Sequence, residues 1–245
     1  MHLLVRSSTH RGTHRDIVKA RKVVIRIENS VFRYDVINCV IAKRFPDSCR
    51  YLEIGVRNPA DCFDRIPASD KTSVDPGAEF SGNPASYKLT SDKFFEDLEA
   101  GQLALAADYK WDVVFVDGLH LAPQTFRDIE NSIAHLSEKG FLLLHDCNPP
   151  DWRHAHSDYE AFRASPTWWN GTVWKALYLF RTKYALASAT LDTDYGVGII
   201  SKGRACVPIE HTNTFFEFGD MKKDRKRQLG LITVEQFRSD FDFFF

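Results

Sequence analysis

Short hydrophobic runs alternate along the chain with segments whose hydrophobic residues recur at helical spacing. The helical segments are residues 31–45, 92–100, 122–137 and 172–182. The hydrophobic runs are residues 50–52, 72–74, 87–89, 113–116, 141–145, 184–187 and 197–200. Strands that alternate with helices are typical of parallel sheets. We therefore expect an α/β fold with a doubly wound, mostly parallel seven-stranded sheet and helices on both faces.

Acidic residues follow three of these runs directly, namely Glu53, Asp75 and Asp117. In open α/β sheets, ligands bind beyond the carboxyl ends of the strands. The three acids therefore indicate a site for a nucleotide-type cofactor.

The turn after the first predicted strand narrows the choice of cofactor. Gly55 closely follows Glu53, but the turn lacks the spacing G-x-G-x-x-G that serves a dinucleotide pyrophosphate, so NAD and FAD are disfavoured. Asp75 lies about 20 residues further on, where an acid holds ribose hydroxyls. This combination resembles the class I S-adenosylmethionine-dependent methyltransferases, which have a Rossmann-like fold.

Three further segments resemble the type-24 methyltransferase domain family within that class. They are Val116-Asp117-Gly118-Leu119-His120, Leu144-His145-Asp146-Cys147-Asn148-Pro149-Pro150 and Gly171-Thr172-Val173-Trp174-Lys175-Ala176. The likeness extends from Tyr51 to Lys202. This bacterial family is often linked to O-methylation of surface glycans and secondary metabolites.

The resemblance implies S-adenosylmethionine as the cofactor. Glu53 and Gly55 would line its methionine part, Asp75 its ribose, and Ser91 with Asp92 its adenine side. The full set of expected cofactor-binding residues is Glu53, Gly55, Val56, Arg57, Asp75, Ser91, Asp92 and Asp117. Arg57 stands where many methyltransferases have a further glycine; it either meets the cofactor carboxylate through its planar fork or is a surface arginine.

A hydroxyl acceptor must lose its proton, to a side-chain base or with the help of a metal that lowers the hydroxyl pKa. In related O-methyltransferases, acids after strands four and five hold magnesium, and here Asp117, His145 and Asp146 take those places. Because imidazole suits manganese, iron or zinc better than magnesium, the expected metal is a divalent ion of open identity. In the alternative, the two aspartates orient loops and His145 is a buried, hydrogen-bonded histidine.

His120, Asp146 and Lys175 are the expected catalytic residues. His120 titrates near neutrality and is the preferred general base, although it also fits a role in fixing its loop. Lys175 either anchors an anionic substrate or is a solvated helix lysine.

Residues 147–167 change in composition to Pro, His, Asp and aromatic residues, and we interpret them as an active-site lid. Trp168, Trp169 and Trp174 either stack on a sugar or aromatic acceptor or pack into the core, and core packing is the stronger expectation for at least two of them.

Composition sets broader limits. With 44% hydrophobic residues, 27% charged residues and a formal net charge of -1, the chain has no overall basic footprint, so we expect no nucleic-acid partner. No hydrophobic stretch approaches the roughly 20 residues that span a bilayer. The five cysteines form no C-x-x-C pair, which favours reduced thiols and a cytoplasmic location.

We expect a single domain over residues 1–245. Its parts are an N-terminal arm and helix (1–48), a cofactor-binding core (49–202) and a C-terminal extension (203–245). Arg6, Arg11 and Arg15 mark the arm as a solvated terminus or a targeting segment. The apolar C-terminus packs on this chain or on a partner, which allows a homo-oligomer.

Together these features predict O-methylation of a small-molecule or glycan hydroxyl, with metal assistance as an open possibility. The alternatives are an N-methyltransferase, which needs less base assistance, and a non-catalytic cofactor-binding or regulatory protein of the same fold.

Overall fold

The computed structural model describes residues 30–80, 82–164 and 168–245, and residues 31–245 form one compact unit. The three arginines of the N-terminal arm lie outside the described residues.

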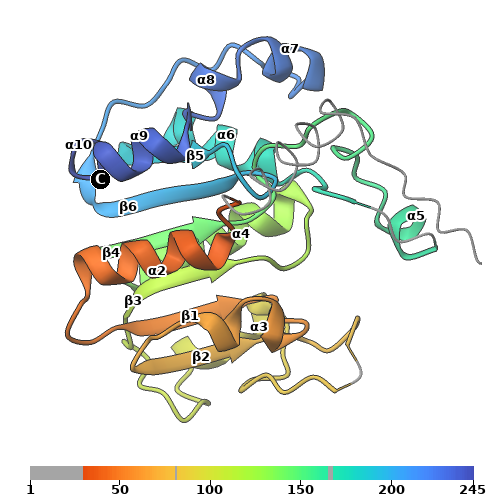
Figure 1. Cartoon of the computed structure of the whole chain (residues 1–245). Helices are drawn as coiled ribbons and strands as arrows, with labels where there is room; N and C mark the ends of the chain where they lie inside the picture. The colour runs from red at the N-terminus through yellow and green to blue at the C-terminus, as the bar shows by residue number, and fades with distance from the viewer. Residues whose placement is uncertain (1–29, 81, 165–167) are drawn as a thin grey trace, which may run out of the picture. The chain divides into compact units, whose positions relative to one another are not determined.

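This unit is built on a seven-stranded sheet (Figure 1). The strands are β1 (Arg50–Ile54), β2 (Asp70–Val74), β3 (Trp111–Val116), β4 (Leu136–Leu144), β5 (Leu186–Leu191), β6 (Val197–Ala205) and β7 (Leu231–Ile232). Their order is β2-β1-β3-β4-β6-β5-β7. Strands β2, β1, β3 and β4 run parallel, β6 runs antiparallel to both of its neighbours, and β7 runs parallel to β5. The predicted Rossmann-like, mostly parallel sheet is confirmed.

One of the predicted strands is wrong. Residues 87–89 contribute only a single parallel bridge, between Tyr87 and Val74. The seventh strand is instead β7, which comes from the C-terminal extension. Tyr87 lies beyond β2 at the edge of the sheet, where its backbone bonds to Ser73 and Asp75 but the pairing does not continue.

Helices cover both faces of the sheet. Their bounds are α2 (Arg33–Arg44), α3 (Ser91–Glu99), α4 (Ala122–His135), α5 (Tyr159–Ala164), α6 (Val173–Lys183), α7 (Phe218–Lys223), α8 (Arg225–Gln228), α9 (Val234–Ser239) and α10 (Phe241–Phe244), with 3-10 turns η1 (Pro59–Asp61) and η2 (Phe63–Arg65). Helix α2 packs on one face through Val36, Ile37 and Val40, and lies in front of the strands in Figure 1. Helices α3, α4 and α6 pack on the other face. Helices α2, α3, α4 and α6 bury their apolar residues against the sheet, which positions the loops at the strand ends.

The apolar C-terminus packs on this chain. Phe237, Phe241 and Phe245 are buried in the same cluster as the residues of α2. This agrees with one of the two alternatives drawn from the sequence; a homo-oligomer remains a prediction.

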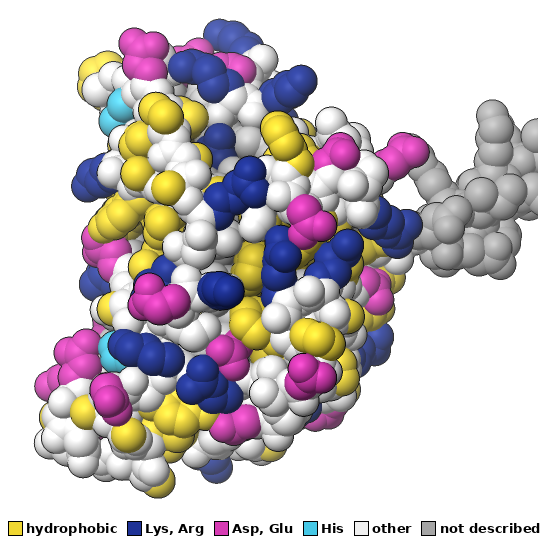
Figure 2. Space-filling view, turned by 90° about the vertical axis from the view of Figure 1, so that its left-hand side faces the viewer, with side chains coloured by type: hydrophobic (Ala, Val, Ile, Leu, Met, Phe, Trp, Pro, Cys, Tyr) yellow, Lys and Arg dark blue, Asp and Glu magenta, His cyan; other side chains and the backbone are white. Residues whose placement is uncertain are grey.

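The loops after β1, β2, β3 and β4 meet at one end of the sheet, on the right in Figure 1, where α5 also lies. Figure 2 shows the side away from α5, where Lys and Arg side chains are interspersed with Asp and Glu. No helix among the described residues is long and apolar enough to cross a membrane.

Candidate active site

A cavity of about 530 Å³ opens at the carboxyl ends of the parallel strands. Loops after β1, β2, β3 and β4 line it from the sheet side, and Tyr159 and Phe162 of α5 line it from the lid. Tyr159 donates its hydroxyl to Glu79 at 3.2 Å, which joins the lid to the loop after β2. A concave site of this size, with apolar walls and converging polar groups, suits a small-molecule cofactor.

The turn after β1 requires a glycine. Gly55 has φ +87°, and a Cβ on it would stand 2.3 Å from the carbonyl oxygen of Asp117. Only glycine takes this conformation without strain and lets the two loops approach so closely. Val56 and Arg57 follow in the cavity wall.

Asp75 is fixed by the backbone of its surroundings. Its carboxylate accepts the N–H of Arg57 at 2.8 Å and the N–H of Gly77 at 2.6 Å. The carboxylate lines the cavity at the end of β2, as expected. The Arg57 guanidinium is paired with Asp61 at 2.7 Å, so in this structure its charge is already engaged.

Glu53 is only 2% exposed and accepts the hydroxyl of Tyr51 at 2.5 Å. Burial raises the pKa of Glu53 to about 8, although the hydrogen bond from Tyr51 opposes the shift. The side chain therefore holds a proton at neutral pH.

Of the two residues expected at the adenine side, one lines the cavity and the other does not. Ser91 lines the cavity and donates to Asp128 at 2.6 Å. Asp92 does not line the cavity; it pairs with Arg127 at 3.0 Å on the surface. Asp92 and Ser91 are adjacent at the start of α3, so their side chains point in different directions.

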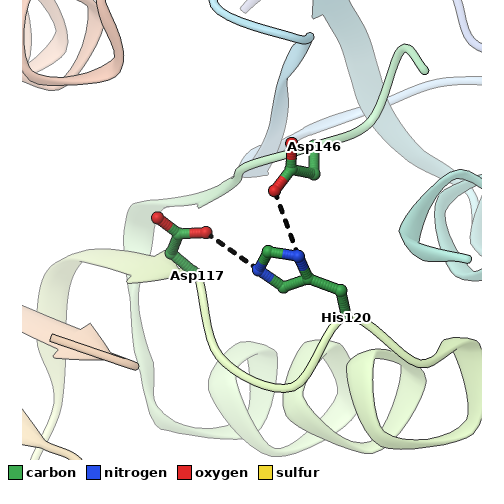
Figure 3. A group of neighbouring side chains, drawn as sticks. All are labelled: Asp117, His120 and Asp146. Carbon is green, nitrogen blue, oxygen red and sulfur yellow. Dashed lines mark hydrogen bonds and ion pairs between the residues drawn. The ribbon is translucent and has the colours of Figure 1, made fainter. Parts of the chain in front are cut away.

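His120 lies between two carboxylates (Figure 3). Its Nε2 is 3.2 Å from Asp117 and its Nδ1 is 3.2 Å from Asp146, and Nδ1 is also 3.1 Å from the carbonyl oxygen of Trp169. Burial lowers the pKa of His120, but Asp146 and Asp117 outweigh it and raise the pKa to about 9. Because every partner is an acceptor, both ring nitrogens donate and the ring is an imidazolium at neutral pH.

Asp146 occupies a strained backbone position. Its φ is +59°, and Asn170 donates to its carboxylate at 2.7 Å. Left-handed backbone at a non-glycine residue persists only where its surroundings hold it, and such positions cluster at functional sites.

His145 faces a cation that the sequence did not point to. Arg33, the first residue of α2, places Nη1 at 2.8 Å from Nε2 of His145 and 3.0 Å from its Nδ1. The same Nη1 is 3.5 Å from Asp117, and the Arg33 backbone N–H donates to Asp194 at 2.9 Å. One signal was available, because an arginine in the first helical turn opposes the helix dipole and needs a partner. We find no comparable signal for Asp194.

The group of possible metal ligands in the structure contains His120 in place of the predicted His145. Asp117, His120 and Asp146 bring one ligand atom each to within 4.8 Å of one another. His145 stands beside the two aspartates, but both of its ring nitrogens contact the Arg33 guanidinium. The donor set of two carboxylate oxygens and one imidazole nitrogen fits a transition metal better than magnesium.

Lys175 does not reach the cavity. It lies in α6 with Nζ 5.5 Å from the centre of the Trp174 ring, and Trp174 is fully buried. Its expected role in substrate binding gains no support from this placement.

Parts of this chain are similar to known proteins. Residues 47–147 match the family described as "Methyltransferase domain". No curated protein matches the chain.

Solved structures with a similar fold include a putative O-methyltransferase from Klebsiella pneumoniae, with 11% identity and a TM-score of 0.44 over 73% of this chain and 83% of that chain. An O-methyltransferase from Bacillus cereus in complex with SAH has 9% identity and a TM-score of 0.45, over 78% and 93% of the two chains. MycE methyltransferase from the mycinamycin biosynthetic pathway, in complex with Mg, SAH and mycinamycin VI, has 14% identity and a TM-score of 0.44, over 71% and 50%.

Residues 47–147 thus match a methyltransferase domain, which supports the resemblance to the class I S-adenosylmethionine-dependent methyltransferases inferred from the sequence.

Proposed function

We propose that this methyltransferase moves the methyl group of S-adenosylmethionine to a hydroxyl of a small molecule, and that His120 takes the hydroxyl proton. The observation that carries the proposal is the position of His120 in the cavity, with one ring nitrogen against Asp117 and the other against Asp146. An amine acceptor needs less base assistance, so this arrangement favours oxygen over nitrogen as the acceptor atom.

The proposed reaction is an in-line displacement. The acceptor oxygen forms a bond to the methyl carbon, the bond from that carbon to the cofactor sulfur breaks, and the sulfur keeps the electron pair. The acceptor proton goes to His120, which must first be unprotonated. The hydroxyl takes the place of one of the two carboxylates at a ring nitrogen of His120, and the other carboxylate accepts the remaining N–H and stabilises the imidazolium that results.

For the cofactor, we propose that the loops after β1 and β2 hold its methionine and ribose parts. Gly55 permits close approach of the backbone. Asp75 offers a carboxylate that the N–H groups of Arg57 and Gly77 orient toward the cavity. Ser91 lies on the adenine side together with Asp128.

A divalent metal would be held by Asp117, His120 and Asp146, and it would lower the pKa of the acceptor hydroxyl. Since the same imidazole cannot bind a metal and accept the acceptor proton, the base and metal roles of His120 are mutually exclusive. A chelator therefore separates them.

The test is methyl transfer from labelled S-adenosylmethionine to a panel of phenols and glycosides, with and without EDTA. His120→Ala should abolish most turnover yet retain affinity for S-adenosylhomocysteine by calorimetry. His154→Ala, in the lid, is the matched control and should keep activity. If the parent protein binds S-adenosylhomocysteine but no hydroxyl compound gains label, the O-methyltransferase assignment fails. Loss of activity in EDTA would assign His120 to a metal instead of the proton.

A further inference from the structure

Trp169, directly after the lid, is a buried tryptophan that also lines the active-site cavity. Core packing describes two of the three tryptophans, because Trp174 is fully buried and Trp169 is 8% exposed, whereas Trp168 is 70% exposed. Trp174 does not line the cavity, so packing alone accounts for its burial. The contacts of Trp169, in contrast, bear on the reaction.

The indole of Trp169 stacks on the imidazole of His120. The ring centroids are 5.4 Å apart and the planes meet at 24°. The carbonyl oxygen of Trp169 lies 3.1 Å from Nδ1 of the same imidazole. The backbone of His120 is held as well, because its carbonyl oxygen accepts the N–H of Thr172 at 2.7 Å. Residues 169–172 therefore hold His120 by both its ring and its backbone.

The same indole is the place where the lid helix docks. Phe162 of α5 stacks on it with centroids 4.9 Å apart and planes at 22°. Tyr159, on the same side of α5, lies 5.7 Å from it with planes at 37°. The indole N–H donates to the carbonyl oxygen of His156, just ahead of α5, at 2.8 Å. Three residues of the lid thus contact one side chain.

The indole lies between Phe162 and His120. Within the described part of the chain these two rings form no pair with each other, although each is nearly parallel to the indole. Two rings that stack on one indole without meeting lie on its opposite faces. Both faces of Trp169 are then covered, so it offers no face to an acceptor. It connects the lid to the group proposed to accept the proton.

The lid side of this stack is the weaker one. Helix α5 has six residues, and none of them is buried. The hydroxyl of Tyr159 donates to Glu79 at 3.2 Å, which joins α5 to the loop after β2 by an exposed bond. Segments with few buried contacts open at low cost in free energy. We therefore expect α5 to dock and undock, while the backbone bonds of residues 169–172 keep Trp169 beside His120.

We propose that Trp169 is a positioning residue through which docking of α5 sets the tilt of the His120 ring. The inference rests on the proposed function only for the role of His120 in proton transfer. The contacts with Asp117 and Asp146 fix an axis through the two ring nitrogens, and the stacked indole limits the tilt of the ring about that axis. A general base must direct a nitrogen at the proton it takes, so this tilt matters for the reaction. The base is fully aligned when the lid is closed, which is how closing lids complete a catalytic site.

The experiment follows the His120 ring by NMR. The full chain carries isotope-labelled histidine, S-adenosylhomocysteine is bound and EDTA is present. The chain has nine histidines, and the signal that disappears in His120→Gln is that of His120. An indole stacked on an imidazole displaces the Cε1–H signal of that imidazole through its ring current. Phe162→Leu removes the lid ring, which does not pair with His120, and should move the His120 signal toward its position in Trp169→Leu.

Turnover is measured in the same variants, on the phenol or glycoside that gains most label. Phe162→Leu should lower kcat by roughly 2–10-fold, the factor to which one aromatic pair corresponds. Its calorimetric affinity for S-adenosylhomocysteine should equal that of the parent, which also shows that it folds. Phe162→Tyr restores a ring and should recover both the signal and kcat. Trp152→Leu is the matched control, because Trp152 is a lid residue that is 68% exposed and lies outside the cavity, and it should change neither.

Each outcome decides. A His120 signal that stays in place in folded Phe162→Leu overturns the proposal. A signal that Phe162→Leu moves equally in the Trp169→Leu background does so too, because the coupling then bypasses the indole. An equal displacement in Trp152→Leu also overturns it, since any change in the lid would suffice. If the signal depends on both Phe162 and Trp169 but no hydroxyl compound gains a methyl group, the proposed function fails and the coupling stands.

Discussion

The guanidinium of Arg33 lies against the imidazole of His145, with Nη1 2.8 Å from Nε2, although the two residues are 112 positions apart in the chain. A guanidinium only donates hydrogen bonds, so this contact opposes protonation of the ring. Asp146 and Asp117 have the opposite effect: they outweigh burial and hold the pKa of His145 well above its ordinary value. Arg33 therefore contributes positive charge to a buried group of acids that the histidines do not balance alone.

Removing the Arg33 charge should destabilise the protein. Arg33→Met keeps the length of the side chain but removes the cation beside Asp117 and Asp194, and we expect a loss of roughly 1–3 kcal/mol in the free energy of unfolding. Urea unfolding measures the difference. Arg153→Met, which breaks the exposed pair with Asp151, should have little effect. Similar curves for both variants would show that Arg33 is dispensable for stability.

The pKa of His120 sets the expected pH dependence. In EDTA, kcat/KM should rise with pH until it levels off near pH 9, because a ring with a pKa raised to about 9 is protonated below that value and cannot accept a proton. His120→Ala should lose roughly 10²–10⁴-fold in turnover. If kcat/KM of the parent instead levels off near the ordinary histidine pKa, and the mutant shows the same pH dependence, another group takes the proton.

Asp75 should contribute to cofactor affinity. Asp75→Ala should weaken S-adenosylmethionine by about 1.5–3 kcal/mol, as for a lost hydrogen bond to a charged group. Since the carboxylate also fixes Arg57 and Gly77, Asp75→Asn serves as the milder variant that keeps an acceptor. Asp64→Ala, in exposed η2, is the control. Calorimetric affinities that match the parent for both Asp75 variants would remove Asp75 from the cofactor site.

The Glu53 carboxyl should make stability fall as the pH rises from 4.5 to about 8. Its folded-state pKa, about 8, lies above the ordinary value of 4.5, so the folded state binds the proton more tightly than the unfolded state does. This stabilisation is complete below pH 4.5 and is lost as the pH rises to about 8. Glu53→Gln, which cannot ionise, should have the flatter profile of Tm between pH 5 and 9. Parallel profiles would contradict the raised pKa.

Gly171 tests how closely His120 must be positioned. Its φ is +59°, and a Cβ on it would stand 2.0 Å from the carbonyl oxygen of His120. Gly101 has a similar φ of +65° with nothing near a Cβ, so Gly101→Ala reports the backbone strain alone, about 1–2 kcal/mol. Gly171→Ala should cost more than that and also lower turnover, since His120 must shift. Equal stability and full activity of both variants would show that the His120 loop accommodates the added methyl group without cost.

The strands that the sequence predicted well are those buried on both faces. Residues 113–116 are fully buried in β3, so their hydrophobic run is continuous and unambiguous. Strand β7 was missed and residues 87–89 were wrongly predicted as a strand, because both lie at sheet edges, where pairing on one side leaves a short and weak pattern.

The candidate site was predictable where a residue directly follows a strand. Gly55, Asp75, Asp117 and Asp146 all line the cavity, as the strand ends implied. The contacts of Arg33 and Asp194 join positions 161 residues apart, and no local pattern reports such a contact. The same limit applies to Lys175 and Asp92, whose helices are correct but whose side chains point away from the cavity.

The side-chain amide of Asn170 joins two loops at the active site, because it donates both to Asp146 and to the carbonyl oxygen of Tyr195. The segment between Pro149 and Trp168 contributes to neither bond. The lid nevertheless holds the backbone of Asn170, whose N–H donates to the carbonyl oxygen of His154 at 3.0 Å. A change in the lid that shifts His154 therefore reaches the carboxylate beside His120 through one buried residue.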